Sequence, residues 1–141
     1  MSKTQQALME AFAGESQANR KYLAFAARAD QEGFSQAAKL FRAAAEAETV
    51  HAHAHLRAAK GIRSTQENLK EAIAGETYEF ESMYPPMIEA AKAEGNKEAE
   101  RSFTYAFEVE KIHARLYQEM LDNLATSKET FSYYVCPVCG F

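Results

Sequence analysis

Apolar and polar positions recur with helical spacing over almost the whole chain, from Lys3 to about Ala125. Three glycine-containing breaks interrupt the pattern, at residues 32–35, 60–64 and 94–96. A glycine readily ends a helix because it adopts the left-handed backbone conformation without steric cost. The pattern therefore predicts four long helices, over residues 3–32, 36–60, 65–94 and 97–125.

Residues next to these breaks are suited to begin helices. Ser35 and Ser64 can each accept a hydrogen bond from a backbone N–H of the first turn, and Glu67 completes a capping box with Ser64. Pro85-Pro86 falls inside the third predicted helix, where the missing N–H groups should kink the helix or open its hydrogen-bond ladder. Four helices of this length favour an all-α bundle.

The composition agrees with this fold and excludes several classes of protein. The 141 residues make about one domain, and abundant alanine with only six Gly and three Pro favours helices over a sheet. A net charge of −4 provides no basic face for nucleic acid. No apolar run approaches the ~20 residues that span a bilayer, and the N-terminus lacks a signal-peptide pattern. We expect a cytoplasmic protein with no nucleic-acid or membrane partner, and we interpret the helically spaced Phe and Met residues as core.

The first pair of predicted helices is repeated by the second pair. Residues 41–52 recur 62 positions later as residues 103–114, with the shared pattern Phe-x-x-Ala-x-Glu-x-Glu-x-x-His-Ala. The Ala-Gly-Glu segment at 13–15 recurs 61 positions later at 74–76. The repeat suggests a pseudo-two-fold site between the two halves.

Each half carries three potential metal ligands. Residues three apart share a helix face, so each Glu-x-x-His pair points at one spot, and the partner helix adds one more Glu. This combination is the di-iron carboxylate set of ferritin-like bundles. Four carboxylates offset the charge of two divalent cations, and imidazole suits iron better than magnesium or calcium. One such pair is usually a solvated helix face, but its repetition favours a two-iron centre. The ligands are Glu15, Glu48 and His51 in the first half and Glu76, Glu110 and His113 in the second.

Glu79 breaks the repeat, because its counterpart in the first half is Ala18. A carboxylate one turn after Glu76 gives seven candidate ligands for two irons. Such an excess allows one iron to exchange ligands, since ferrous iron accepts neutral imidazole and ferric iron prefers the harder carboxylate. The alternative is that Glu79 pairs with a lysine or arginine on the surface.

Tyr22 and Tyr84 are 62 positions apart, and each lies two turns from a ligand on the same helix face. A phenol at this place can hydrogen-bond a liganding carboxylate. The alternative is that both are ordinary core aromatics.

Cys136 and Cys139 form a Cys-x-x-Cys pair in the tail that follows the last helix. This pattern indicates a metal or redox role rather than a structural disulfide. A tetrahedral iron–thiolate centre needs four thiolates, so an Fe or Zn site here requires residues from outside this chain. Truncation is the explanation we favour; a partner chain and a vestigial motif are the alternatives. We expect residues 1–125 to form the di-iron bundle and residues 126–141 to form a linker and tail.

Taken together, these segments resemble the rubrerythrin family over essentially the whole chain. The tail is similar to the first knuckle of a rubredoxin iron site. The resemblance implies a peroxidase that reduces hydrogen peroxide to water in oxidative-stress defence. Its electrons are implied to come from NAD(P)H through a reductase or rubredoxin. The segments that carry the resemblance are residues 12–19, 45–51, 74–85, 108–113 and, in the tail, 134–140.

The resemblance also implies roles for the metal ligands. It implies that Glu48 and Glu110 bridge two iron ions. Glu15 is implied to bind one of these irons, and Glu76 and His113 the other.

Four further residues are implied to take part in catalysis. His51 and Glu79 are the implied exchanging pair, with His51 bound in the reduced form and Glu79 in the oxidised form. The family's tyrosines next to the ligands fall on Tyr22 and Tyr84.

The loop at residues 61–64 constrains assembly. A ferritin-like bundle runs its second and third helices parallel, so the chain must return along a helix of ~37 Å at ~1.5 Å per residue. Four residues reach at most ~14 Å. We therefore expect a homodimer that swaps helix pairs, with each di-iron site built from two chains. A simple up-down-up-down monomer remains the alternative.

Two other functions compete with the peroxidase. A ferroxidase or iron-handling protein of the ferritin type has a similar site, and a non-catalytic scaffold can be stabilised by metal. Nothing in the sequence indicates the cage contacts that iron storage needs, and a scaffold leaves the excess of ligands unexplained. Glu79 and the Cys-x-x-Cys tail favour the peroxidase.

Overall fold

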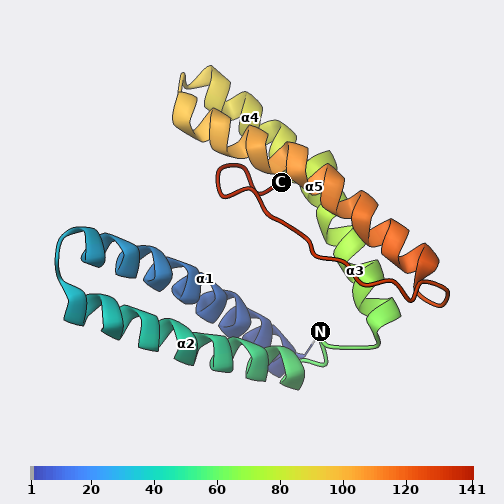
Figure 1. Cartoon of the computed structure of the whole chain (residues 1–141), viewed down its shortest axis with the longest axis horizontal. Coiled ribbons are helices and arrows are strands. Elements are labelled where there is room, and N and C mark those ends of the chain that lie inside the picture. Colours follow the sequence, from blue (N-terminus) through green and yellow to red (C-terminus); the bar gives the residue numbers. More distant parts are fainter. Residues whose placement is uncertain (1) are drawn as a thin grey trace. The chain divides into compact units, whose positions relative to one another are not determined.

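The computed structural model describes residues 2–141, which form helices joined by short turns and contain no strand (Figure 1). The four predicted helices are confirmed, and the third is divided into three parts. The elements are α1 (Lys3–Gln31), α2 (Ser35–Ala58), α3 (Thr65–Tyr78), the π-helical turn η1 (Glu79–Met83), α4 (Tyr84–Ala93) and α5 (Lys97–Asn123).

The turn between α1 and α2 differs from the prediction at Ser35. Gly33 has the left-handed φ of +82° that ends α1, and the Phe34 N–H then donates to the Ala29 carbonyl at 2.8 Å. Phe34 therefore occupies the N-cap of α2, without a side-chain hydrogen bond, and Ser35 is already helical. The prediction that Ser35 caps this helix was wrong, because the turn closes one residue earlier than the serine.

The start of α3 and the interruption after it follow the sequence closely. Ser64 and Glu67 form the predicted capping box. In η1 the Tyr84 N–H donates to the Glu79 carbonyl, five residues back, and Pro85-Pro86 comes next. The predicted opening of the hydrogen-bond ladder at the proline pair is confirmed in the form of a π turn.

The π turn explains why the repeat interval changes along the chain. The interval from Tyr22 to Tyr84 is one position longer than the interval from Glu15 to Glu76. The second half therefore holds one extra residue between Glu76 and Tyr84. A π turn spans one more residue than an α turn, and η1 lies within this interval, so it accommodates the extra residue.

The chain forms two compact units, divided between Arg63 and Ser64. The first unit is the antiparallel hairpin of α1 and α2 (Figure 1). Its large apolar side chains stay partly exposed: Phe25 is 47% and Leu40 is 68% accessible. The Phe and Met core that we expected is therefore not formed within the hairpin, whose fully buried contact is made by small side chains. Its buried residues are Asn19, Ala26, Ala29, Ala38, Ala45, Ala52 and Ala59.

In the second unit, α3, η1 and α4 pack against α5, and the C-terminal segment runs back along α5 (Figure 1). Ala91 and Val109 are its buried apolar residues. The expected boundary between residues 125 and 126 stays a prediction. Within residues 2–141, none of the helices has both the length and the apolar character needed to cross a bilayer.

Candidate metal centre

The first ligand cluster consists of Glu15 on α1 with Glu48 and His51 on α2. The His51 Nδ1 lies 2.8 Å from the Glu48 Oε2, across one turn of helix, and 3.9 Å from the Glu15 Oε1. One potential ligand atom from each residue lies within 4.8 Å of the others. The side chain of Glu48 is only 18% exposed, whereas that of His51 is 56% exposed. The cluster therefore presents two oxygens and one nitrogen around a single point on the hairpin.

The second ligand cluster repeats this arrangement with Glu76 on α3 and Glu110 and His113 on α5. The His113 Nδ1 lies 2.7 Å from the Glu110 Oε2 and 3.6 Å from the Glu76 Oε2. Its three potential ligand atoms also lie within 4.8 Å of one another. All six sequence-predicted ligands are thus gathered in two matching sets of three, one in each unit.

The carboxylates of the second ligand cluster crowd one another. Burial, a hydrogen bond with Glu110 and the negative charge of Glu110 raise the pKa of Glu76 to about 7, and His113 only partly offsets this. Burial also raises the pKa of Glu79, assisted by the charge of Glu110. Partly buried carboxylates that repel each other are stabilised by a cation, which restores their charged form.

This crowding makes the stability of the metal-free protein depend on pH. Between the ordinary carboxyl pKa of 4.5 and a pKa of about 7, folded Glu76 keeps a proton that the unfolded chain has lost. The folded state then binds more protons, so stability falls as the pH rises through this window. In the wild-type protein the free energy of unfolding should fall by on the order of 1 kcal/mol between pH 5 and 8, after a discount for solvent screening, which is a few degrees in Tm. We expect Glu76→Gln to abolish this decrease.

Thermal unfolding followed by circular dichroism at pH 5, 6, 7 and 8, with chelator present, measures this effect. Glu108→Gln is the matched control, since Glu108 is an exposed carboxylate on α5 that pairs with Lys111. The Tm of the control should fall with rising pH as steeply as that of the wild-type protein. An equally steep fall in Glu76→Gln would contradict the crowding of the second ligand cluster.

Glu79 lies beside the second ligand cluster, at the start of η1. The charges that influence its pKa are those of Glu110 and His113, and its role as a ligand stays a prediction. It is not one of the three residues of the tight set, whose atoms meet within 4.8 Å. A third carboxyl group thus lies beside the second ligand cluster, whereas the corresponding position of the first half is Ala18.

The two tyrosines have different surroundings. The pKa of Tyr84 is raised by burial and by the charges of Glu79, Glu110 and Glu76, which places this phenol next to the second ligand cluster. Tyr22 instead lies in an aromatic group, with ring centroids 6.3 Å from Phe25 and 6.2 Å from Phe41. Tyr84 also packs against an aromatic ring, with its centroid 6.4 Å from that of Phe103. A hydrogen-bonding role for either tyrosine stays a prediction.

Cys136 and Cys139 lie in a tight loop at the C-terminus. The Cys136 N–H donates to the Phe141 carbonyl at 2.5 Å, and the Gly140 N–H donates to the Cys136 carbonyl at 2.9 Å. Hydrogen bonds from the backbone of Cys139 and Val138 lower the pKa of the Cys136 thiol, as suits a thiolate ligand. Within residues 2–141 no third metal-binding side chain joins the two cysteines. An Fe or Zn site here stays a prediction that depends on residues beyond this chain.

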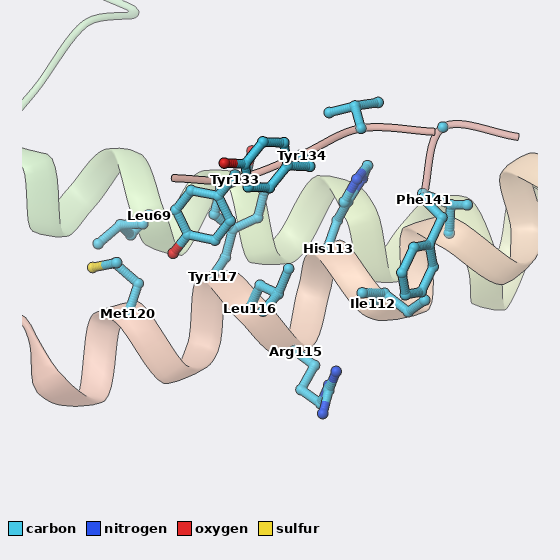
Figure 2. Close-up of a pocket in the computed structure, with 13 residues that line it drawn as sticks. Leu69, Ile112, His113, Arg115, Leu116, Tyr117, Met120, Tyr133, Tyr134 and Phe141 are labelled. Carbon is cyan, nitrogen blue, oxygen red and sulfur yellow. The ribbon is translucent and has the colours of Figure 1, made fainter. Parts of the chain in front are cut away.

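A cavity of about 530 Å³ lies next to the second ligand cluster, between α5, α3 and the C-terminal segment. Figure 2 shows the His113 ring directed toward this segment, whereas Arg115 points away. Tyr133, Tyr134 and Phe141 contribute to the walls, and no acidic side chain of the described residues does. Sequence reasoning treated the tail separately and missed this contact, because no periodic pattern links an irregular segment to a helix.

The donor chemistry of the two ligand clusters fits iron. Each cluster offers two carboxylates and one imidazole, the mixed oxygen and nitrogen set that iron accepts and that magnesium and calcium rarely use. Two such clusters provide four carboxylates, which balance two divalent ions. The predicted composition of a di-iron site is therefore matched by the side chains present.

Comparison with known proteins gives one consistent answer. The sequence model of the rubrerythrin family matches residues 6–121. Rubrerythrin-2 of Clostridium acetobutylicum is 37% identical over 95% of this chain and 82% of its own length. Nigerythrin of Nitratidesulfovibrio vulgaris is 34% identical over 95% of this chain and 73% of its own length. The solved structure of fully reduced, all-ferrous nigerythrin aligns over 100% of this chain and 76% of its own, with a TM-score of 0.56 and 32% identity.

Proposed function

Since the chain belongs to the rubrerythrin family, we propose that it is a non-haem di-iron peroxidase that reduces hydrogen peroxide to water. The observation that carries this proposal is the pair of matched ligand clusters, each with two carboxylates and one histidine. The additional carboxyl group of Glu79 beside only one of them supports redox chemistry over simple metal storage.

The ligands are assigned as the family resemblance implies. Glu48 and Glu110, the two least exposed carboxylates of the clusters, would be shared by both ions. Glu15 would hold one iron, and Glu76 and His113 would hold the other. When bound, the iron pair supplies the two electrons that split the O–O bond of peroxide.

The remaining residues manage charge and protons around the bound ions. His51, the most exposed of the proposed ligands, would hold the iron in its reduced form, and Glu79 would hold it in its oxidised form. Tyr84 keeps its phenolic proton because its pKa is raised, so it can donate a hydrogen bond to a neighbouring carboxylate. Tyr22 holds the corresponding position in the first unit.

The electron source and the assembly complete the proposal. The electrons come from rubredoxin or from an NAD(P)H-linked reductase. Two chains form a homodimer that exchanges its helix pairs, so that each di-iron site takes the first unit of one chain and the second unit of the other. The exposure of Leu40 and Val50, at 68% and 60%, supports association, because a two-helix hairpin leaves apolar surface without a partner.

A comparison of oxidants tests the peroxidase directly. Reduced, iron-loaded protein should be oxidised by hydrogen peroxide at least about tenfold faster than by dioxygen, because a peroxidase stabilises the transition state of O–O cleavage in peroxide. Stopped-flow absorbance of the ferric product, recorded anaerobically with each oxidant at equal concentration, measures both rates. The reverse order would favour the ferroxidase.

A further inference from the structure

The buried part of the contact between α1 and α2 is made almost entirely by alanine, whereas the ring contacts of Phe41 with Tyr22 and Phe25 are only partly buried. Along α2 and its C-cap, the buried residues follow one another at intervals of seven, which is the heptad spacing of a helix–helix seam: Ala38, Ala45, Ala52 and, at the cap, Ala59. The methyl group of alanine is too short to interlock with side chains of the facing helix, so several axial positions of the two helices pack about equally well. An all-alanine seam therefore holds two helices close together but fixes their axial register weakly.

One polar residue interrupts this seam. Asn19 lies seven residues before the buried Ala26 of α1, and it is the buried polar residue of the described chain, with 8% of its surface exposed. Its side-chain N–H groups donate to the Ala45 carbonyl at 2.6 Å and to the Thr49 Oγ1 at 2.8 Å. Its Oδ1 accepts a hydrogen bond from the Arg20 Nε at 2.9 Å.

Each of these bonds has a definite position along the helix. If α1 moved by one residue relative to α2, a shift of ~1.5 Å, the Asn19 amide would lose both acceptors while remaining buried. A buried asparagine in a seam of small or apolar residues is a known means of setting register. Other contacts that depend on the register, such as the Arg42–Asp30 ion pair and the ring contacts of Phe41, are more exposed. Asn19 is thus the buried residue of this hairpin whose hydrogen bonds distinguish one axial position from its neighbours.

The hydrogen bonds of Asn19 lie one helical turn from the first ligand cluster. On α1, Glu15 precedes Asn19 by four residues and shares its face. On α2, Glu48 lies directly before Thr49, an acceptor of Asn19. The register that these bonds select is the register in which Glu15 faces Glu48 and His51.

We propose that Asn19 is a positioning residue that sets the register of the α1–α2 hairpin and so aligns the first ligand cluster for its metal ion. This role rests on the metal centre proposed above. It is confined to the first unit, because the second half has no asparagine at the matching position. The repeat intervals of 61 and 62 residues make Phe80 or Glu81, both within η1, the counterpart of Asn19. The counterparts of Ala45 and Thr49 are Phe107 and Lys111, neither of which repeats this pattern.

Asn19→Ala tests the role, because it extends the alanine seam and strands no buried partner. The Ala45 carbonyl still accepts from Thr49 Oγ1 at 3.1 Å, and exposed Arg20 can turn to water. Anaerobic titration of the full-length, metal-free protein with Co²⁺, followed by its visible absorption bands, measures each ion's affinity and coordination. We expect one of the two ions to bind about 10–100-fold more weakly with an altered spectrum, and the other to bind near the wild-type affinity.

Two further measurements separate positioning from folding. Gln17→Ala removes an exposed amide two residues away on α1 and should titrate as wild type. Thermal unfolding of metal-free Asn19→Ala should match or exceed wild type, because an alanine replaces a buried polar group. Thr49→Val, which leaves the Ala45 acceptor in place, should weaken the same ion by a smaller factor.

The outcomes distinguish this role from the proposed function. Wild-type Co²⁺ binding in Asn19→Ala overturns the positioning role and leaves the di-iron proposal intact. A collapse of thermal stability in that variant makes Asn19 a folding residue and also overturns the role. Failure of the wild-type protein itself to bind Co²⁺ overturns the metal centre, and the positioning role with it.

Discussion

Glu110→Ala is expected to abolish the iron pair and, with it, the reduction of peroxide. Glu110 is the least exposed carboxylate of the second ligand cluster, at 15%, and it contacts His113 and raises the pKa of Glu76. Its removal takes away one cluster's central oxygen donor. Loss of a residue that merely supports a ligand costs about 10–100-fold, so loss of this ligand should lower the rate by more than about 100-fold. Iron analysis after reconstitution and a peroxide consumption assay measure the two effects.

Glu108→Ala is the matched control for this variant. Glu108 lies on the same helix two residues earlier, and its side chain is 60% exposed and pairs with Lys111. This variant should retain iron and activity. Normal iron content in Glu110→Ala would remove Glu110 from the metal centre.

The same ligand also reports on the exchange of helix pairs. If two chains share their sites, refolding Glu48→Ala together with Glu110→Ala restores one intact site in each mixed dimer, or about a quarter of all sites. In an unswapped monomer the mixture stays as inactive as its components. Iron content of the refolded mixture separates the two assemblies.

Glu79→Ala is expected to leave two irons bound while slowing peroxide turnover by about 10–100-fold. Glu79 lies outside the tight set of three ligands but close enough for its pKa to be influenced by Glu110 and His113. As the proposed exchanging ligand, Glu79 would hold a bound iron in only one redox state, so its loss should affect turnover more than binding. Steady-state rates at saturating peroxide, with iron content determined on the same samples, test this expectation.

Glu81→Ala provides the comparison within the same π turn, since Glu81 is exposed and two residues further on. It should behave as wild type in both measurements. An unchanged rate in Glu79→Ala would place Glu79 among ordinary surface carboxylates, and loss of iron would make it a permanent ligand.

Much of this fold was readable from the sequence because its signals are local. Helical spacing and three glycine breaks located the helices to within one or two residues, and the capping box at Ser64 was found from its Glu67 partner. The six candidate ligands were found because the motif is doubled, and both copies fold into the same three-residue geometry. The wrong prediction at Ser35 shows the limit of such signals. A serine at the N-cap and a serine at the first helical position, where Ser35 lies, cannot be told apart from the sequence.

Features that depend on contact between helices were less accessible. The lengthening of the repeat interval by one position was visible, but only the structure places the extra residue in η1. Asn19 was missed because a single asparagine in an alanine-rich helix carries no periodic signal, although it occupies a heptad position seven residues before Ala26. The large apolar residues were expected in the core, yet a hairpin of two helices has too little surface to cover them.

The iron content of the reconstituted protein tests the central claim most directly. Two irons per chain are predicted for the wild-type protein, and fewer than one for the Glu48→Ala/Glu110→Ala double variant, which lacks a carboxylate in both ligand clusters. Inductively coupled plasma analysis of desalted samples, reconstituted with and without air, gives both values. Absence of iron from the wild-type protein under both conditions, or two irons in the double variant, would contradict a di-iron centre built from these clusters.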